Sequence, residues 1–425
     1  MNEREVTIFL LQIAVMLAVG LTFGNFVRRF GWPMVIGELL GGIILGPTIL
    51  GGLAPGYYTW LFPPSADVAA GRDALTRIGM MLFLFVAGLE VNLAFAGKRG
   101  WSILWTSIFG IVLPFGLGLG AVLALPGIWG RQAGGDELLF GVFMGAALSI
   151  SALPVIARIL SDLDLLRSEI GLIVMSSATI NDLIGWSLFA AILSQFAPED
   201  GPRRGLGLSI AFVFAVFVLV LTLGRRYGAP LILHAGRRLH QPGGVIALTV
   251  TLVLLAGAGA QAVGVHTVFG AFLLGVMLSK PTDRRDEVAE VLYQFVVSFL
   301  APVYFVSVGV RTNFLAHFDV RIVGVVLIVA CLGKIVGVAA GARLGGMNVR
   351  DSFAVAFAMN ARGAIEIILA SVALEHGLID ERIFVALVIM ALLTSMLSGP
   401  AVQFLLKPSG EQARTKSDPL PAGRP

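Results

Sequence analysis

Charged residues are scarce in this sequence. Asp, Glu, Lys and Arg make up only 13% of its 425 residues, while 57% of the residues are hydrophobic. A soluble domain carries about 25% charged residues, so the composition excludes a soluble globular fold and predicts a protein that crosses the membrane several times. The net charge of +4 reflects how the basic residues are distributed among the loops, and it offers no argument for a nucleic-acid partner.

Residue types that build covalent or metal-bound sites are also nearly absent. The single cysteine, Cys331, falls inside an apolar run and excludes an intramolecular disulfide. The five histidines lack the spacing of metal ligands, and the sequence contains no phosphate-binding glycine loop. We therefore predict no cofactor, and we interpret His266, which follows a short polar break, as a structural residue.

Long apolar runs are what the sequence contains instead. A helix needs roughly 17–25 apolar residues to cross the hydrocarbon core of a membrane. Such runs predict an all-α polytopic membrane protein, with a transmembrane domain at residues 1–406 and a short polar cytoplasmic tail at 407–425. The thirteen runs lie near residues 6–26, 33–53, 75–96, 101–125, 137–160, 168–197, 206–223, 243–262, 265–279, 288–310, 319–343, 351–375 and 382–406.

The distribution of Lys and Arg predicts the orientation of these helices. If the helices alternate in direction, most of the 30 basic residues fall on one side, and such an excess marks the cytoplasmic side. We predict that the N-terminus lies outside and the C-terminus in the cytoplasm, in a bacterial inner (plasma) membrane. The first run lacks a small-residue cleavage site, so a retained helix is expected rather than a signal peptide, and no soluble regulatory domain is expected.

The run "MGAALSISALPVIARIL" is interrupted. Pro154 lacks a backbone donor and disfavours helix at Leu153, which frees carbonyl groups beside Ser149 and Ser151. Non-helical backbone at the membrane midplane is tolerated only where it is buried in protein or lines a cavity. The sequence predicts a broken helix here, and the alternative is a simple proline kink.

A second interruption lies in "AFAMNARGAIEIILASVAL". Asn360, Arg362 and Gly363 break an otherwise apolar run, and Arg362 with Glu366 forms an i,i+4 pair. We interpret Asn360, Arg362 and Glu366 as support for the broken helix rather than as ion ligands. The alternative is a loop between two short helices.

Two charged residues lie in the runs next to these breaks. Asp182, in "SSATINDLIGW", follows the first break, and Lys334, in "ACLGKIVGV", precedes the second. This reversed order is typical of inverted repeats. A charge at bilayer depth costs at least ~2.5–3.5 kcal/mol on insertion scales and marks a functional site by default. Asn181 points ~100° away from Asp182 on a helix, so the two side chains do not share a face.

These residues resemble the monovalent cation:proton antiporter superfamily, in its second branch, which includes the Kef-type potassium/proton systems, the NapA-type sodium/proton antiporters and the plant cation/proton exchangers. The resemblance covers about residues 6–406. The motifs that carry it are "PMVIGELLGGIILGPTILG", "LFLFVAGLEVN", "ALSISALPVIARILSDLDLL", "SSATINDLIGW", "VHTVFGAFLLGVML", "PVYFVSVGV" and "AMNARGAIEIILA".

The resemblance implies the sodium/proton antiporter fold and a homodimer, with two bundles and two broken helices that cross at the ion site. It implies that Asp182 binds a proton or the transported Na⁺ or K⁺, and that Lys334 faces this acid. Asn181, Ser149 and Ser151 are the other residues that we predict in the ion- and proton-binding site, with the two serines as candidate oxygen ligands. Many second-branch members carry two adjacent acids where this chain has Asn181 and Asp182, which leaves a single carboxylate.

The sequence therefore predicts a secondary active transporter, embedded in membrane lipid, that exchanges Na⁺ or K⁺ for H⁺ by alternating access. We expect the exchange to be electroneutral, with one cation per proton. One alternative is a regulated, channel-like potassium efflux protein, which would need a regulatory partner. Another is an intramembrane aspartyl protease, but that enzyme needs two catalytic aspartates in helices and only Asp182 is available. We do not expect an enzyme.

Overall fold

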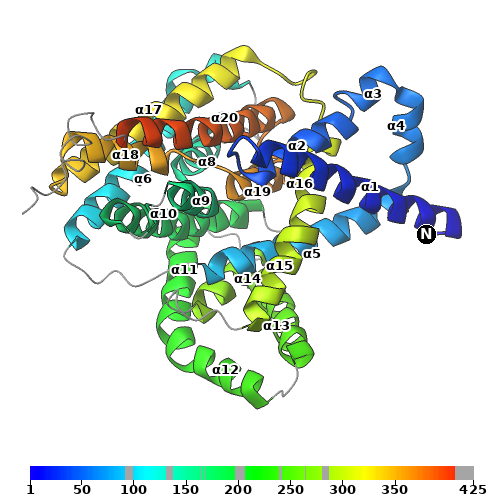
Figure 1. The fold of residues 1–425 in the computed structure, drawn as a ribbon, viewed down its shortest axis with the longest axis horizontal. Coiled ribbons are helices and arrows are strands. Elements are labelled where there is room, and N and C mark those ends of the chain that lie inside the picture. Colours follow the sequence, from blue (N-terminus) through cyan, green and yellow to red (C-terminus); the bar gives the residue numbers. More distant parts are fainter. Residues whose placement is uncertain are drawn as a thin grey trace, which may run out of the picture.

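In the computed structural model, nearly all of the described residues lie in helices (Figure 1). The predicted tail at 407–425 lies outside the residues that the structure describes. These residues are 1–90, 99–130, 137–163, 165–166, 168–196, 206–238, 242–263, 265–279 and 287–406.

Ten α-helices cover the described part of the first half of the chain. They are α1 (Glu3–Arg28), α2 (Met34–Leu45), α3 (Leu50–Leu53), α4 (Pro55–Leu61), α5 (Ala66–Leu89), α6 (Gly100–Ala124), α7 (Pro126–Trp129), α8 (Glu137–Ser149), α9 (Leu153–Asp162) and α10 (Glu169–Leu193).

The described part of the second half adds ten α-helices, one 3₁₀ turn and two π-helical segments. In order they are the 3₁₀ turn η2 (Ser194–Phe196), α11 (Leu206–Leu219), the π-helix η3 (Val220–Gly228), α12 (Ala229–Arg238), α13 (Pro242–Ala262), α14 (Thr267–Leu278), α15 (Glu287–Phe295), the π-helix η4 (Val296–Leu300), α16 (Ala301–Arg311), α17 (Val320–Leu344), α18 (Val349–Met359), α19 (Ala364–Glu375) and α20 (Glu381–Leu406).

Polar residues cap several of the long helices at their N-termini. Asn2 and Glu5 form a capping box at α1, Ser168 caps α10, and Asp319 caps α17. A cap of this kind satisfies backbone donors that have no partner inside the helix. The short polar stretches between the apolar runs therefore fix where these helices begin.

The predicted count of thirteen spans is not confirmed. Within the described residues, nine helices are long and apolar enough to cross a membrane, or ten if the bent pair α18 and α19 counts as one span. The remaining predicted runs contain shorter or more polar helices. Helices α8 and α14 are short, and α5 carries four charged residues in its first half.

The helices form two bundles. Helices α6, α8 to α10 and α17 to α20 pack on one another, and we call them the broken-helix bundle. Helices α1, α2, α5 and α13 to α16 form a second group, the panel bundle, in which α5 packs on α14 and α2 packs on α1 and α16. In Figure 1, α17, α18 and α20 lie together, and α1, α2 and α16 lie beside them. Two bundles are what the sequence analysis predicted.

Helices α6 and α17 approach each other closely through glycines. A Cβ atom at Gly337 would lie 2.4 Å from the carbonyl oxygen of Phe109, and one at Gly341 would lie 2.3 Å from that of Trp105. Small residues let membrane helices approach to backbone contact. This contact brings Lys334, one turn before Gly337 on α17, against the backbone of α6.

We expect Gly337→Ala to destabilise the protein, because its added methyl group would overlap the Phe109 carbonyl oxygen of α6. Overpacking typically costs about 1–3 kcal/mol of unfolding free energy. The midpoint of thermal unfolding of the purified protein in detergent should therefore fall. Gly324→Ala, on the same helix, is the control, since no described atom lies within 4 Å of a Cβ there. Equal midpoints for the two variants would show that the close contact is not required.

Candidate ion-binding site

The two predicted breaks lie in contact. Helix α8 ends at Ser149 and α9 begins at Leu153, while α18 ends at Met359 and α19 begins at Ala364, with a bend of 46° between the last two helices. Residues 150–152 are not helical, so the first break is more than a proline kink.

Backbone hydrogen bonds join the two non-helical segments. The amide of Ala152 donates to the carbonyl oxygen of Ala361 at 3.0 Å. The hydroxyl of Ser151 donates to the carbonyl oxygen of Met359 at 2.9 Å, at the end of α18. The breaks therefore satisfy part of each other's backbone, as buried non-helical segments in a membrane must.

Arg362 connects the second break to the end of α8. Its side chain is fully buried and donates to the carbonyl oxygens of Ala147 at 3.0 Å, Leu148 at 2.5 Å and Ile150 at 3.2 Å. The last carbonyl groups of a helix have no partner within the helix. A guanidinium group with five donors can satisfy several of them at once.

Glu366 and Ser395 complete the surroundings of Arg362. The Glu366 Oε1 atom lies 3.2 Å from Arg362 Nη1 and forms a buried i,i+4 ion pair. The hydroxyl of Ser395, on α20, donates to the carbonyl oxygen of Arg362. Asn360 contacts a different helix, since its amide group donates to the sulfur of Cys331 on α17 at 3.7 Å. Arg362 and Glu366 thus lie where helix support was predicted, and Asn360 lies against α17.

Asp182 lies on α10 beside the first break. It is only 3% exposed, and its Oδ1 atom has no hydrogen-bond partner among the described residues. The carboxyl group interacts with the backbone amide of Leu153, at the N-terminus of α9, and with the charge of Lys334. A helix N-terminus favours negative charge. Asp182 is therefore a buried carboxylate, and one of its oxygens has no hydrogen-bond partner among the described residues and can bind another group.

Lys334 is fully buried on α17 and is held by backbone oxygens. Its Nζ atom donates to the carbonyl oxygen of Ser149 at 2.5 Å and to that of Gly110 at 3.0 Å. The Ser149 carbonyl is the last of α8, so the ammonium group satisfies a helix end just as Arg362 does. Lys334 therefore joins three helices, α17, α8 and α6.

Asn181 supplies a third acceptor for Lys334. With its oxygen turned toward the lysine, the side chain accepts from Nζ at 3.0 Å, while its nitrogen donates to the carbonyl oxygens of Ser177 at 3.2 Å and Ser107 at 3.3 Å. We assign this orientation because it gives three hydrogen bonds. Since an ammonium group has three donors, Lys334 is fully engaged without a direct bond to Asp182.

The two candidate hydroxyl ligands donate their hydrogens to backbone oxygens. Ser149 donates to the carbonyl oxygen of Gly145 at 2.7 Å and to that of Ile111 at 3.2 Å, and Ser151 donates to Met359. A hydroxyl that donates in this way keeps lone pairs that can bind a cation. The role of these two serines as ligands stays a prediction.

Helix α6 is the part of the site that sequence analysis missed. Gly110 and Ser107 of this helix contribute backbone carbonyl groups to the site. The only signal in the sequence is the polar pair Thr106 and Ser107 inside the apolar run 101–125. Backbone acceptors leave no side-chain pattern that could have identified them.

The buried charges of this site balance when Asp182 is ionised. Asp182 and Glu366 are acidic, and Lys334 and Arg362 are basic. A proton or a monovalent cation on Asp182 would each add one positive charge. Within the described residues, no group of three or more His, Cys, Asp or Glu side chains could hold a resident metal ion. The arrangement therefore suits one exchangeable monovalent ion.

A family model for the transmembrane region of sodium/hydrogen exchangers matches residues 13–408. Cation/H(+) antiporter 19 from Arabidopsis thaliana is 32% identical to this chain over 417 residues, which are 96% of this chain and 51% of that protein. The chain thus spans about half the length of the plant relatives that it matches.

A relative of similar length and a solved structure also match. Na(+)/H(+) antiporter NhaS4 from a Synechocystis strain is 30% identical over 407 residues, which are 95% of this chain and 98% of that protein. The structure of the sodium proton antiporter MjNhaP1 from Methanocaldococcus jannaschii at pH 8 matches with a TM-score of 0.64 and 16% identity, covering 95% of this chain and all of that chain. This match shows that the two proteins share a fold.

We expect Arg362→Lys to destabilise the protein although it keeps the charge. A lysine has three donors on one atom and cannot reproduce the planar fork that spans the Ala147, Leu148 and Ile150 carbonyl groups. Hydrogen bonds from charged groups contribute about 1.5–3 kcal/mol each, so the loss of even one should lower the unfolding midpoint clearly.

Arg343→Lys is the matched control, because Arg343 also donates to a backbone carbonyl, that of Met347, but from an exposed position in the last turn of α17. Thermal unfolding of both variants in detergent measures the difference. If Arg362→Lys unfolds at the same temperature as Arg343→Lys, the contacts between Arg362 and α8 do not support the site.

Proposed function

Because this chain belongs to the sodium/hydrogen exchanger family, we propose that it is a secondary active transporter that exchanges a monovalent cation, Na⁺ or K⁺, for H⁺ by alternating access. The family comprises transporters rather than enzymes. NhaS4 is named as a Na⁺/H⁺ antiporter, and a relative from Saccharomyces cerevisiae, 28% identical over 438 residues, is named as a K⁺/H⁺ antiporter. Both cations therefore stay candidates.

One observation carries the proposal, namely the buried Asp182 carboxylate with an open oxygen beside the crossing breaks. Non-helical backbone at membrane depth is typical of ion sites in transporters, where helix ends contribute partial charges. A carboxylate of this kind can hold a proton or a cation but not both. Each substrate therefore displaces the other, and exchange is coupled without contact between the two.

We further propose that one cation is exchanged for one proton, so that transport is electroneutral. Asn181 cannot titrate, and the Nζ atom of Lys334 lies within hydrogen-bond distance of three oxygen acceptors, which supports a lysine that keeps its proton through the cycle. Asp182 is then the one group in the cycle that changes its protonation. A proton and a monovalent cation carry the same charge. The loaded site therefore has the same net charge with either ion, and a complete cycle moves no net charge across the membrane.

The chain is an integral membrane protein that crosses the membrane several times. We propose residues 1–406 as the transport domain and 407–425 as a cytoplasmic tail, with the N-terminus outside, as the distribution of basic residues predicts. A homodimer is part of the same proposal. The relatives come from a plant, a yeast and bacteria, so they do not support a bacterial membrane over any other.

Asp182→Asn should abolish exchange, since the amide removes the titratable charge at nearly equal volume. The assay uses purified protein in liposomes that contain a pH dye, with Na⁺ or K⁺ added outside, and unfolding midpoints show that the variant is folded. Glu169→Gln is the control, because it changes an exposed carboxyl group on the same helix. A proton gradient that still collapses in the Asp182→Asn protein on addition of either cation would refute the assignment.

The stoichiometry can be tested by clamping the membrane potential with K⁺ and valinomycin, with Na⁺ as the test cation. Electroneutral exchange predicts no net Na⁺ flux at balanced Na⁺ and H⁺ gradients, whatever the potential, and robust flux when a pH gradient is imposed. A Na⁺ flux driven by potential alone would show that more than one proton moves per cation, or that the protein conducts as a channel.

A further inference from the structure

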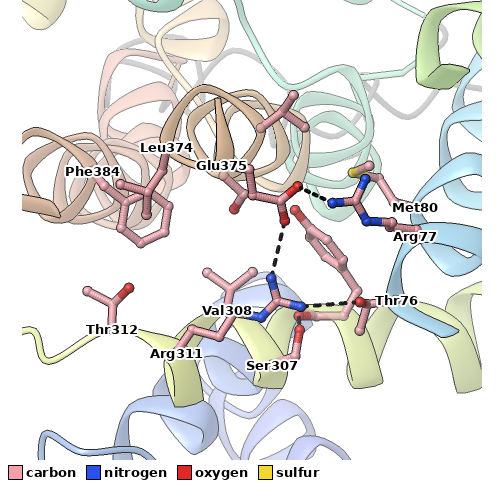
Figure 2. A pocket seen from close by; sticks show the side chains of 13 residues that line it. Thr76, Arg77, Met80, Ser307, Val308, Arg311, Thr312, Leu374, Glu375 and Phe384 are labelled. Atoms are coloured by element: carbon pink, nitrogen blue, oxygen red, sulfur yellow. Dashed lines mark hydrogen bonds and ion pairs between the residues drawn. The ribbon is translucent and has the colours of Figure 1, made fainter. Parts of the chain in front are cut away.

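A cluster of charged residues joins the two bundles at one end of the molecule. Glu375 is the last residue of α19, in the broken-helix bundle. Its two carboxyl oxygens pair with Arg77 of α5 and with Arg311 of α16, each at 3.2 Å, and both arginines belong to the panel bundle. Figure 2 shows Glu375 between the two guanidinium groups. Arg311 is itself fixed by Asp73 of α5 at 2.5 Å.

The residues of the ion pairs that join the bundles line a hollow at the seam between them. The hollow is lined from both sides, by Thr76 and Ser307 of the panel bundle and by Ser371 and Phe384 of the broken-helix bundle. Its lining does not include Asp182, which is only 3% exposed. The hollow therefore does not reach Asp182.

Helix α19 links this cluster to the ion site. It begins at Ala364, directly after the second break, and ends at Glu375; its 12 residues correspond to a length of ~18 Å. A continuous helix transmits movement as a rigid element. If the broken-helix bundle moves relative to the panel bundle, Glu375 must leave at least one of its two arginines.

We propose that Glu375, Arg77 and Arg311 form a latch that holds the seam closed at this end, and that the latch opens whenever Asp182 becomes accessible from this side. The proposal rests on exchange by alternating access. The pairs are half-exposed, with side-chain exposures of 31% for Glu375, 32% for Arg311 and 61% for Arg77. Exposed pairs are individually weak, so the latch biases the two states and still opens in each cycle.

Thiol labelling can show how often the latch is open, without a measurement of transport. Cys331 is the only cysteine in the sequence, so Cys331→Ser gives a background free of thiols, and Ser371→Cys places one thiol in the lining of the hollow. A membrane-impermeant maleimide then reports how often the seam is open. Right-side-out and inside-out vesicles, labelled separately, show on which side the hollow opens.

Glu375→Gln in this background should raise the labelling rate from one side only. We expect an increase of about three- to tenfold, which is the range over which two half-exposed ion pairs can shift a two-state equilibrium. Arg311→Gln removes one of the two bridging pairs and should give a smaller increase, and it tests the latch independently if Glu375→Gln fails to fold. Arg382→Gln is the control, because Arg382 pairs at 2.8 Å with Asp380 of its own bundle and has a similar exposure.

An unchanged labelling rate in both latch variants, or the same increase in Arg382→Gln, would overturn the proposal. The outcome does not depend on whether the transported ion is correctly identified, because labelling reports the seam and not the flux. If exchange is measurable, the proposal also predicts a change in the apparent KM. Opening the latch should lower the apparent KM for the cation on the latch side and raise it on the opposite side, whereas general damage would lower the maximal rate alone.

Discussion

The structure depends on how Arg362 satisfies the open end of α8. A chain that stops being helical inside a membrane exposes carbonyl groups that neither lipid nor water can bind there. Arg362 reaches three of these groups, at Ala147, Leu148 and Ile150, and it comes from the other broken helix. The first broken helix therefore needs the second one to satisfy its free carbonyl groups. This is why the two non-helical segments cross in contact rather than lying in separate parts of the bundle.

The basic side chains that bind these helix-end carbonyl groups also set the charge around Asp182. Arg362 and Lys334 both stabilise helix-end carbonyl groups, and each brings a positive charge into the protein interior. Glu366 is paired with Arg362, which leaves the charge of Lys334 to be balanced by Asp182. Asp182 balances this charge without a hydrogen bond to Lys334. Its Oδ1 atom therefore keeps the capacity to bind another partner. This setting supports the proposal that Asp182 binds a proton or a small cation and repels anions.

The sequence predicted the breaks and the buried charges because such features are costly in a membrane. Pro154, Arg362, Asp182 and Lys334 each interrupt an apolar run, and they can be recognised without any knowledge of tertiary contacts. The partners of Arg362 could not be predicted in this way, since they are carbonyl groups more than 200 residues away along the chain. The same holds for the backbone of α6, and for the number of spans, where short or charged helices such as α5 do not follow a simple length rule.

Asn181 shows how one residue unites packing and chemistry at this site. Its amide accepts from Lys334 and donates to the carbonyl oxygens of Ser177 and Ser107. A carboxylate at position 181 could accept from the lysine, but it could not donate to these two carbonyl groups, and it would face them with like partial charge. The packing of α10 against α6 therefore favours an amide. Only one of the two neighbouring residues 181 and 182 therefore carries a carboxyl group, as a consequence of how three helices satisfy their backbones.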